Sequence, residues 1–470
     1  MKVLLINPPS PNDSIIIRDF NRSGRTSKER IIWPQTGLAY LAAMLDKNIS
    51  VEIVDCIAEN MKWPEFLKLL KEKNPLYLIS HLITSTAKND LRVFKEAKKI
   101  NPNVVTITMG PHPTALPEET LKENRDLDFI IMHEPELTFK ELINTIEKGE
   151  NNFTNIKGIS FINENNEVQI NEKREYIENL DELPIPRHDL MPLDKYIFPF
   201  MASNFTFVIP SRGCPYLCTF CRQPIMWDKK FRYRSSKSII EELKFLKKIG
   251  IKEFIFQADT FTINKEVVVE ICEKMISENL NFRWSCNSRV DTVDEKTLKL
   301  MKKAGCWMIA YGIESGSQEI LDRSKKEITL KQIEDTIRLT YDIGIKIYGY
   351  FIIGLIGETK ETIQKTIDLS KKLPITFAIF HTASPYPKTE LYEEAKEKGW
   401  LVAENWEDID QGTTAPLNYP NLSSKEINKG IIKAYRSFYL RPKAIWRILT
   451  SLRKIKDIKS LFQAFINQIF

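Results

Sequence analysis

The sequence contains no long hydrophobic run. A single helix needs about 20 apolar residues to cross a bilayer, and no segment here has even 18 in succession. The apolar run near the N-terminus, Val3–Ile6, is too short for a secretory signal peptide. Cysteines are also few, seven among 470 residues, and they lack the spacing of a disulfide framework. These absences predict a chain of the reducing cytoplasm rather than a secreted or membrane-spanning protein.

The composition is otherwise that of a folded protein. Hydrophobic residues make up 43% of the chain, which is enough for full cores, and the length predicts about three domains. The net charge of +6 is modest for this length. Four cysteines are scattered without a C-x-x-C motif, and we expect them to be small buried hydrophobic side chains: Cys56, Cys272, Cys286 and Cys306.

The other three cysteines lie in one segment, Ser211-Arg-Gly-Cys214-Pro-Tyr-Leu-Cys218-Thr-Phe-Cys221. Their spacing is C-x3-C-x2-C, with Phe220 directly before the last thiol. Iron–sulfur clusters normally take four cysteines, so three thiolates would leave one iron of a [4Fe–4S] cluster open to another ligand. A zinc site is the alternative, but zinc usually takes a fourth Cys or His. The nearest such residue, His188, lies beyond a proline-rich connector.

The first 150 residues alternate between short apolar runs and amphipathic stretches. The runs are continuous, as in parallel strands that are covered on both faces. They predict strands at Val3–Ile6, Val51–Val54, Leu76–Ser80, Val104–Met109 and Phe129–Met132, with helices near 37–47, 62–73, 87–100 and 136–148. Five βα units of this length predict an α/β domain, a Rossmann-like doubly wound parallel sheet over 1–150, with ligands at the carboxyl ends of the strands.

Residues 151–199 predict a small β element and a proline-rich linker. The βα alternation then resumes over 200–400. Strands are predicted at Phe205–Ile209, Glu253–Gln257, Phe282–Cys286, Trp307–Gly312, Lys346–Ile353 and Thr376–Phe380. Six such units predict a partial (β/α)6 barrel, with the cysteine loop after its first strand, at the mouth where barrel active sites lie. Residues 401–470 predict a C-terminal helical region.

The cysteine loop resembles that of the radical-SAM superfamily, and segments after strands two to five match the superfamily in order and spacing. The resemblance implies that Cys214, Cys218 and Cys221 hold a [4Fe–4S] cluster whose open iron binds S-adenosylmethionine. It implies cleavage of that molecule to methionine and a 5′-deoxyadenosyl radical. The residues implied for the S-adenosylmethionine site are Phe220, Ala258, Asp259, Arg289, Glu314, Ser315, Gly316 and Gly354.

The resemblance gives two of these residues specific roles. Arg289 is expected to pair with the carboxylate of S-adenosylmethionine as a bidentate fork, and Glu314 to hold ribose hydroxyls. The glycines are expected to permit close approach of the nucleoside. Each residue also has an ordinary alternative, because charged residues and glycines are common where strands end.

The N-terminal domain resembles the cobalamin-binding domain of one class of radical-SAM enzymes. The residues implied for cobalamin are Pro34, Gly37, Asp55, Gly110, His112 and Glu134. There is no D-x-H-x-x-G motif, so no obvious histidine is available as a lower ligand of cobalt. The turn after the fifth strand reads His133-Glu-Pro-Glu136, where the class has G-E-G-E. A domain that binds nothing, or that helps to form a substrate pocket, is the alternative.

The end of the chain is basic and amphipathic. From Arg436 onward there are eight Lys or Arg residues against one acid, Asp457, and apolar residues recur at helical spacing from Ile445 to Ile469. This pattern predicts either a helix at a membrane surface or a helix packed on the body of the chain. Similar tails accompany family members that act on lipids, which favours a prenyl-like or other lipid-like small-molecule substrate. No RNA-binding module is recognisable, so no nucleic-acid partner is expected.

The resemblance therefore predicts a radical-SAM enzyme that methylates carbon with the help of cobalamin. It is expected in the cytoplasm or peripherally on the inner face of the membrane, with an electron donor such as flavodoxin or ferredoxin. One alternative is a radical-SAM enzyme for cyclisation, oxidation or carbon–carbon coupling without methylation. Another is a non-enzymatic iron–sulfur sensor or scaffold. A tRNA methylthiotransferase is disfavoured, because only Cys56 precedes the cysteine loop.

Overall fold

A computed structural model describes residues 2–19, 24–198, 200–201 and 204–450. Its contacts divide the chain into two units. The N-terminal unit comprises Met1–Ser27, Ile32–Tyr196 and Arg222–Asp228, and the barrel unit comprises Lys28–Ile31, Ile197–Cys221 and Lys229–Phe470.

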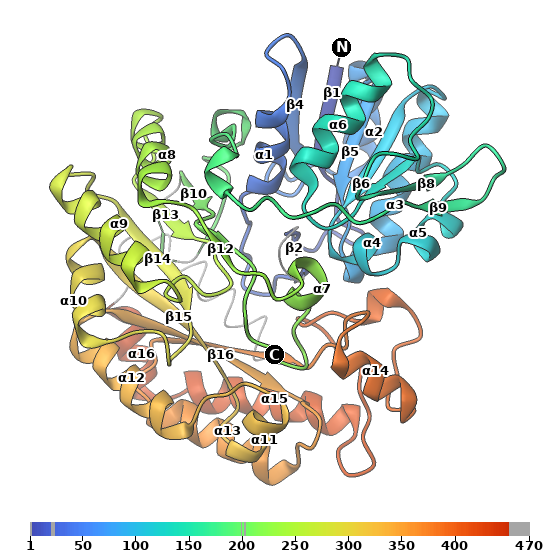
Figure 1. Ribbon diagram of the computed structural model, residues 1–470. Coiled ribbons are helices and arrows are strands. Elements are labelled where there is room, and N and C mark those ends of the chain that lie inside the picture. Colours follow the sequence, from blue (N-terminus) through green and yellow to red (C-terminus); the bar gives the residue numbers. More distant parts are fainter. Residues whose placement is uncertain (1, 20–23, 199, 202–203, 451–470) are drawn as a thin grey trace. The chain divides into compact units, whose positions relative to one another are not determined.

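The N-terminal unit is built on a seven-stranded sheet of order β4-β1-β5-β6-β7-β8-β9 (Figure 1). The first five of these strands pair in parallel. In chain order this parallel part has the 2-1-3-4-5 arrangement of flavodoxin-like folds, whose strand order reverses at the β1–β5 boundary. The strands are β1 (Lys2–Asn7), β4 (Ser50–Asp55), β5 (Tyr77–His81), β6 (Val105–Met109), β7 (Phe129–Ile131), β8 (Ile159–Ile162) and β9 (Val168–Ile170).

Helices that connect the strands bury one face each. In α3, Leu91, Phe94 and Ala97 are spaced by about one turn and pack into a core that also contains Leu78 and Ile130. The other elements of this unit are β2 (Ile16–Ile17), β3 (Arg25–Thr26), α1 (Thr36–Met44), α2 (Trp63–Lys73), α3 (Ala87–Ile100), α4 (Pro111–Ala115), α5 (Pro117–Glu123), α6 (Pro135–Glu147) and α7 (Gln223–Trp227).

The predicted doubly wound sheet and its five parallel strands are confirmed. The β element predicted after residue 150 is also present, but it belongs to the same sheet, because β8 pairs antiparallel with β7 and β9 with β8. The sequence does not predict α4 or α5. Each starts at a proline and has only five or seven residues, which is too short for an amphipathic repeat to be visible.

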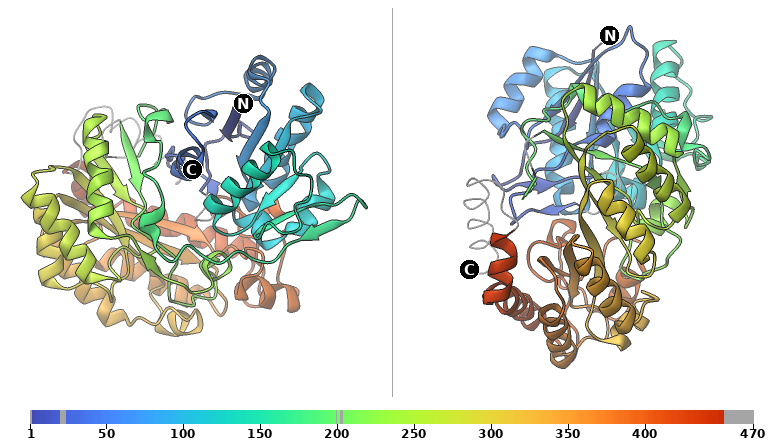
Figure 2. Two further views of the ribbon diagram at one scale, coloured as in Figure 1. Left: turned by 45° about the horizontal axis from the view of Figure 1, so that its top comes forward. Right: turned by 90° about the vertical axis from the view of Figure 1, so that its left-hand side faces the viewer.

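The barrel unit is built on six parallel strands in sequential order, β10-β13-β14-β15-β16-β17, which confirms the predicted partial barrel. The strands are β10 (Phe205–Val208), β13 (Glu253–Phe256), β14 (Arg283–Ser288), β15 (Cys306–Glu314), β16 (Lys346–Ile353) and β17 (Phe377–Thr382). Helices follow the strands on their outer side (Figures 1 and 2): α8 (Ser236–Lys248), α9 (Lys265–Ser277), α10 (Glu295–Lys303), α11 (Gln318–Arg323), α12 (Leu330–Asp342) and α13 (Lys360–Lys372).

Three helices follow the barrel: α14 (Glu390–Glu397), α15 (Ser424–Tyr439) and α16 (Pro442–Leu449). The α15 helix packs on β17, where Phe380 N donates to the Tyr435 hydroxyl at 3.2 Å. The predicted basic tail helix starts as α16, and its continuation from Leu452 to Ile469 lies outside the described residues. Within the part of the chain that the structure describes, none of the helices has the length and hydropathy of a membrane span.

Candidate functional site

The cysteine loop follows β10, the first strand of the barrel. A short antiparallel ribbon of β11 (Ser211–Arg212) and β12 (Arg232–Tyr233) flanks it. The loop thus starts at the carboxyl end of the strand, the side on which barrel active sites lie. Its three cysteines are partly exposed, whereas the four scattered cysteines are buried, as predicted.

The donor set fits a cluster better than a single metal ion. All seven cysteines are free of disulfides. A zinc site usually takes four protein ligands, and the loop supplies three free thiols. A [4Fe–4S] cluster binds its cysteines through different irons, so three thiols fit a cluster with one iron left open.

Contacts from three later elements hold the cysteine loop. The guanidinium carbon of Arg289, directly after β14, lies 3.5 Å from the centre of the Tyr216 ring. The Thr219 N–H donates to the Ser324 carbonyl at 3.1 Å, and the Thr219 carbonyl accepts a hydrogen bond from Leu391 N at 3.0 Å. The loop is therefore fixed by the end of β14, by the turn after α11 and by the start of α14.

Burial controls the protonation of the thiols. It raises the pKa of the Cys214 thiol to about 11, and it also raises the pKa of Cys218, where the positive charges of Lys326 and Arg289 act against the rise. Such thiols are protonated at neutral pH, while metals bind the thiolate. Metal binding at this loop must therefore release protons.

Arg289 and Glu314, the charged residues predicted for the S-adenosylmethionine site, are both paired within the protein. Arg289 donates from Nε and Nη2 to the two carboxylate oxygens of Asp291, at 2.9 Å each. The bidentate fork expected for the ligand carboxylate is thus engaged by Asp291. Glu314 Oε1 accepts a hydrogen bond from Lys326 Nζ at 2.8 Å. Their contacts with S-adenosylmethionine stay predictions.

Ser315, Gly316 and Gly354 lie beyond β15 and β16, and each packs against another part of the chain. The Gly316 N–H donates to Thr366 Oγ1 of α13 at 2.8 Å, and a Cβ on this glycine would lie 2.4 Å from a backbone oxygen of that helix. Gly354 has φ +95°, and its carbonyl accepts a hydrogen bond from the Tyr419 hydroxyl at 2.7 Å. The close approach that these glycines permit in the structure is to the protein itself.

The remaining predicted residues of this site are Phe220, Ala258 and Asp259. Phe220 lies within the cysteine loop and is half-buried. Ala258 and Asp259 follow β13, and the Ala258 carbonyl accepts a hydrogen bond from Asn287 Nδ2 at 3.4 Å. Asp259 lies near enough to Cys214 for its charge to add to the rise that burial causes in the thiol pKa. Ala258 and Asp259 thus lie at the same end of the barrel as the cysteine loop.

In the N-terminal unit, polar residues gather at the carboxyl edge of the sheet. The β1 strand ends at Asn7, β4 at Asp55 and β5 at His81, and Gly110 directly follows β6. This is the edge, at the reversal of strand order between β1 and β5, where flavodoxin-like folds bind their ligands. The predicted cobalamin residues Asp55 and Gly110 therefore lie along the same edge, at β4 and β6.

Asp55 is fully buried at this edge. Its Oδ1 accepts hydrogen bonds from Asn7 Nδ2 at 2.7 Å and from the N–H groups of Ile57 and Ala58 at 3.1 Å each. Burial nevertheless raises the pKa of Asp55 to about 6. Burial lowers the pKa of His81 to about 3, so this imidazole is neutral at neutral pH.

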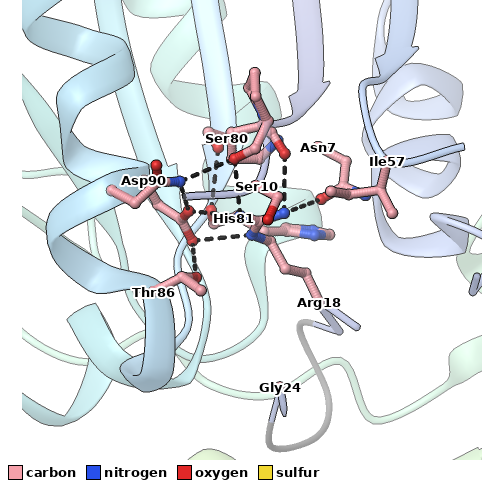
Figure 3. A network of polar contacts seen from close by, with 12 residues as sticks. Asn7, Ser10, Arg18, Gly24, Ile57, Ser80, His81, Thr86 and Asp90 are labelled. Atoms are coloured by element: carbon pink, nitrogen blue, oxygen red, sulfur yellow. Dashed lines mark hydrogen bonds and ion pairs between the residues drawn. The ribbon is translucent and has the colours of Figure 1, made fainter. Parts of the chain in front are cut away.

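A buried ion pair of Arg18 and Asp90 lies beside Asn7, to which Arg18 is hydrogen-bonded (Figure 3). Arg18 Nη2 is 2.8 Å from Asp90 Oδ1, and Thr86 Oγ1 donates to Asp90 Oδ2 at 2.6 Å. Arg18 Nη1 also donates to Asn7 Oδ1 at 3.1 Å and to the Pro8 carbonyl at 2.9 Å. Sequence reasoning missed Arg18 and Asp90, because neither belongs to a motif or to a recognisable spacing.

Gly110 is a predicted cobalamin residue, and its surroundings leave no room for any residue other than glycine. It has φ +121°, and a Cβ there would lie 2.6 Å from the Leu82 carbonyl oxygen. It directly precedes α4, in which His112 is buried and has its pKa lowered by burial to about 4. Pro34 and Gly37 are both buried around the start of α1.

The turn that lacks the two glycines of the class still has a left-handed residue, His133, with φ +58°. Its N–H donates to Thr114 Oγ1 at 3.1 Å, and its ring lies edge-on to Tyr176 with 6.2 Å between centroids. The next residue, Glu134, is buried and accepts a hydrogen bond from Ile177 N at 2.8 Å. Glu134 therefore fixes the segment around Ile177. Its role toward cobalamin stays a prediction.

These residues fit a large polar cofactor. Four polar side chains are buried at this edge of the sheet, Asn7, Asp55, His81 and His112. Glycine at position 110 also lets the backbone run close to a neighbouring strand end. Buried polar groups at the ligand edge of a flavodoxin-like sheet are compatible with bound cobalamin.

Comparison with known proteins identifies both units. The B12 binding domain matches residues 27–143, and the radical SAM superfamily matches residues 208–370. An uncharacterized methyltransferase of Pyrococcus horikoshii is 39% identical over 95% of this chain and 94% of its own length. The anaerobic magnesium-protoporphyrin IX monomethyl ester cyclase of Rubrivivax gelatinosus is 28% identical over 87% of this chain and 74% of its own length.

Solved structures agree with this fold. The methyltransferase TsrM from Kitasatospora setae, with cobalamin and a [4Fe–4S] cluster bound, has a TM-score of 0.68 at 16% identity, covering 92% of this chain and 81% of that one. OxsB with aqua-cobalamin and S-adenosylmethionine bound has a TM-score of 0.65 at 21% identity, covering 84% of this chain and 55% of that one. With a relative 39% identical along nearly its whole length and both family models matched, the chain belongs to the cobalamin-dependent radical-SAM methyltransferase family, whose cofactors are a [4Fe–4S] cluster, S-adenosylmethionine and cobalamin.

Proposed function

We propose that this enzyme methylates a carbon atom of a small hydrophobic or lipid-like molecule. The observation that carries methylation is the 39% identity, over 95% of this chain, to a relative named as a methyltransferase. When bound, the cluster and S-adenosylmethionine supply a radical that removes hydrogen from carbon, and cobalamin supplies the methyl group.

The residues of the chain take separate tasks in this proposal. Cys214, Cys218 and Cys221 bind three irons, on a loop that Arg289 holds through Tyr216. The eight residues predicted for S-adenosylmethionine, from Phe220 to Gly354, bind that molecule at the same end of the barrel.

The cobalamin site is assigned to the carboxyl edge of the N-terminal sheet. Asp55 shapes the turn at Ile57 and Ala58 through two backbone hydrogen bonds, and Gly110 keeps the strand ends close together. Pro34, Gly37, His112 and Glu134 complete the proposed site.

A lipid-like substrate is supported by the surface of α16. One face of this helix packs on the barrel unit, since Ala444 is fully buried and Arg447 Nη1 donates to the Ile375 carbonyl at 3.2 Å. Ile445 and Trp446 are 47% and 68% exposed. Exposed apolar side chains among basic residues favour contact with an anionic membrane surface, where lipid-like substrates are found.

A second candidate is a radical-SAM reaction without methyl transfer. It is favoured by the cyclase of R. gelatinosus, which is 28% identical over 87% of this chain. Cyclisation, oxidation or carbon–carbon coupling would use the same cysteine loop. In either case the cluster needs an electron, for which we propose a flavodoxin- or ferredoxin-type donor.

The test uses the full chain, loaded anaerobically with iron, sulfide and cobalamin and reduced with flavodoxin. S-adenosylmethionine with an isotopically labelled methyl group is supplied together with a cell extract that contains lipids and water-soluble molecules. Methylation predicts 5′-deoxyadenosine, labelled methionine, S-adenosylhomocysteine and label in a lipid. Formation of 5′-deoxyadenosine and labelled methionine without S-adenosylhomocysteine and without label in any molecule of the extract would contradict methylation and support the second candidate. Label transferred only to water-soluble molecules of the extract would contradict a lipid-like substrate.

A further inference from the structure

We infer that Lys326 is a positioning residue whose positive charge makes the cluster at Cys214, Cys218 and Cys221 easier to reduce. The inference rests on the proposed assignment of these cysteines as cluster ligands. Lys326 belongs to none of the sequence segments that predict the S-adenosylmethionine site, and it comes to notice only through its surroundings in the fold.

The turn that carries Lys326 lies directly against the cysteine loop. The Ser324 carbonyl accepts the hydrogen bond from Thr219 N, and Thr219 is the residue after Cys218. The Lys326 carbonyl accepts a hydrogen bond from Arg289 Nη2 at 2.8 Å. Since the guanidinium of Arg289 also covers Tyr216, the turn after α11 and the cysteine loop are held together at two points.

The ammonium group of Lys326 is buried, and the absence of a side chain at Gly312 leaves the space that it occupies. Its Nζ lies 2.8 Å from Glu314 Oε1, and both side chains are less than a tenth exposed. A Cβ at Gly312 would lie 2.4 Å from Glu314 Oε1 and 2.9 Å from Lys326 Nζ. Buried ion pairs are poor stabilisers compared with apolar packing of the same size, so a buried lysine here suggests a role other than stability.

The neighbouring Lys325 provides the contrast. Its side chain is 50% exposed and pairs with Glu390, which is 58% exposed, at 2.7 Å. The two lysines are adjacent in sequence and carry the same charge. They differ in burial and in their distance from solvent, which decides how strongly a charge acts on its surroundings.

The buried positive charge of Lys326 is carried on a turn that is hydrogen-bonded to Thr219, the residue after Cys218. Reduction of a cluster adds one negative charge. A buried positive charge nearby stabilises that added electron, because opposite charges attract strongly where water is excluded.

The test compares Lys326→Met with its matched control Lys325→Met and with Lys326→Arg. Each full-length protein is loaded anaerobically, its iron and sulfide are counted, and the cluster is titrated with dithionite while its electron paramagnetic resonance signal is followed. One electron passes from dithionite to the cluster. S-adenosylmethionine is left out, so that a role of Lys326 in binding that molecule does not enter the potential.

We expect Lys326→Met to move the midpoint to a more negative potential, by about tenfold in the one-electron equilibrium or about 59 mV. Lys325→Met and Lys326→Arg are expected to keep the potential of the parent. Lys326→Met with a full cluster and an unchanged potential would overturn the inference. If Lys326→Met loses iron, the double variant Lys326→Met/Glu314→Gln removes both charges, and it is expected to bind iron with a midpoint below that of the parent.

The outcomes separate the two claims. Iron lost from the single and the double variant but kept by Lys325→Met would overturn the redox role in favour of a structural one. Failure of the parent and of Lys325→Met to bind iron would instead refute the assignment of the cysteines, on which the inference depends.

Discussion

Arg18 and Asp90 form an ion pair at 2.8 Å in which neither side chain has any exposed surface. The pair joins the segment directly after β2 to α3, and through Asn7 it reaches Asp55. Desolvating two charges is expensive, and the cost is offset only when the remaining polar atoms also have partners. Thr86 and the Pro8 carbonyl supply such partners here. The proposed cobalamin edge thus has a rigid polar support beneath it.

Arg18→Met is expected to destabilise the protein by about 3–5 kcal/mol, because Asp90 would be left buried without its counter-charge. Burial already raises the pKa of Asp90, and Arg18 opposes that rise. Urea unfolding measures the loss, and corrinoid content is expected to fall with it. Lys122→Met is the control, since it breaks an exposed pair with Glu118. Equal stability of the two variants would contradict a supporting role for Arg18.

Gly312→Ala is expected to weaken the Glu314–Lys326 pair, because the added methyl group needs the space of Glu314 Oε1 and Lys326 Nζ. We expect lower thermal stability and less bound iron. Gly430→Ala is the control, since its Cβ would meet only side-chain atoms, at 3.2 Å or more. A Gly312→Ala protein with the stability and iron content of the control would show that the pair has room to move.

Glu358 is expected to give the chain a pH-dependent stability, whose sign follows from the burial of its carboxyl group. Burial raises its pKa to about 8, its Oε2 accepts a hydrogen bond from Gly354 N, and its Oε1 has no partner among the described residues. The folded protein therefore keeps a proton that the unfolded chain releases near pH 4.5. Stability from this group is present below about pH 4.5 and is lost as the pH rises toward about 8.

Glu358→Gln is expected to remove that loss, since an amide does not titrate and still accepts from Gly354 N. Between pH 6 and 7.5 the parent should lose about 2 kcal/mol more stability than the variant. Urea unfolding at both pH values measures the difference. Glu361→Gln, at an exposed position of the following helix, is the control and should behave like the parent. Parallel pH profiles for Glu358→Gln and the parent would contradict a protonated Glu358.

Trp446→Ser is expected to weaken binding to vesicles of anionic phospholipid, because the 68% exposed indole is the largest apolar group on α16. Sedimentation with vesicles measures the bound fraction. Leu76→Ser changes an apolar side chain of 48% exposure on the N-terminal unit and should bind like the parent. Binding that is the same for both variants, or absent in the parent, would contradict a membrane contact through α16.

Much of the fold is predictable from sequence, because parallel strands that are covered on both faces consist of continuous runs of apolar residues. All five N-terminal and all six barrel strands lie within a few residues of their predicted ranges. The cysteine loop is equally visible, since three thiols on one loop constrain its chemistry. The edge hairpin β8–β9 was visible as a hairpin, but its place in the larger sheet depends on pairing with β7, which no local pattern encodes.

Local sequence does not predict which residues pair with the charged side chains. Arg289 was expected to present its fork to a ligand, yet Asp291, two residues away, engages it. Lys326 and Glu314 are twelve residues apart, and Arg18 and Asp90 are separated by 72. Such pairs form only when the fold brings distant elements together, so they emerge from tertiary structure and not from spacing.

The most direct test of the account is to count iron, sulfide and corrinoid in one anaerobic preparation supplied with cobalamin, alongside Cys218→Ala and Asp55→Ala. The account predicts about four irons and one corrinoid per chain in the parent. Cys218→Ala should lose iron and keep corrinoid, and Asp55→Ala should lose corrinoid and keep iron. A parent without corrinoid, or a Cys218→Ala protein with its full iron content, would contradict the central claim.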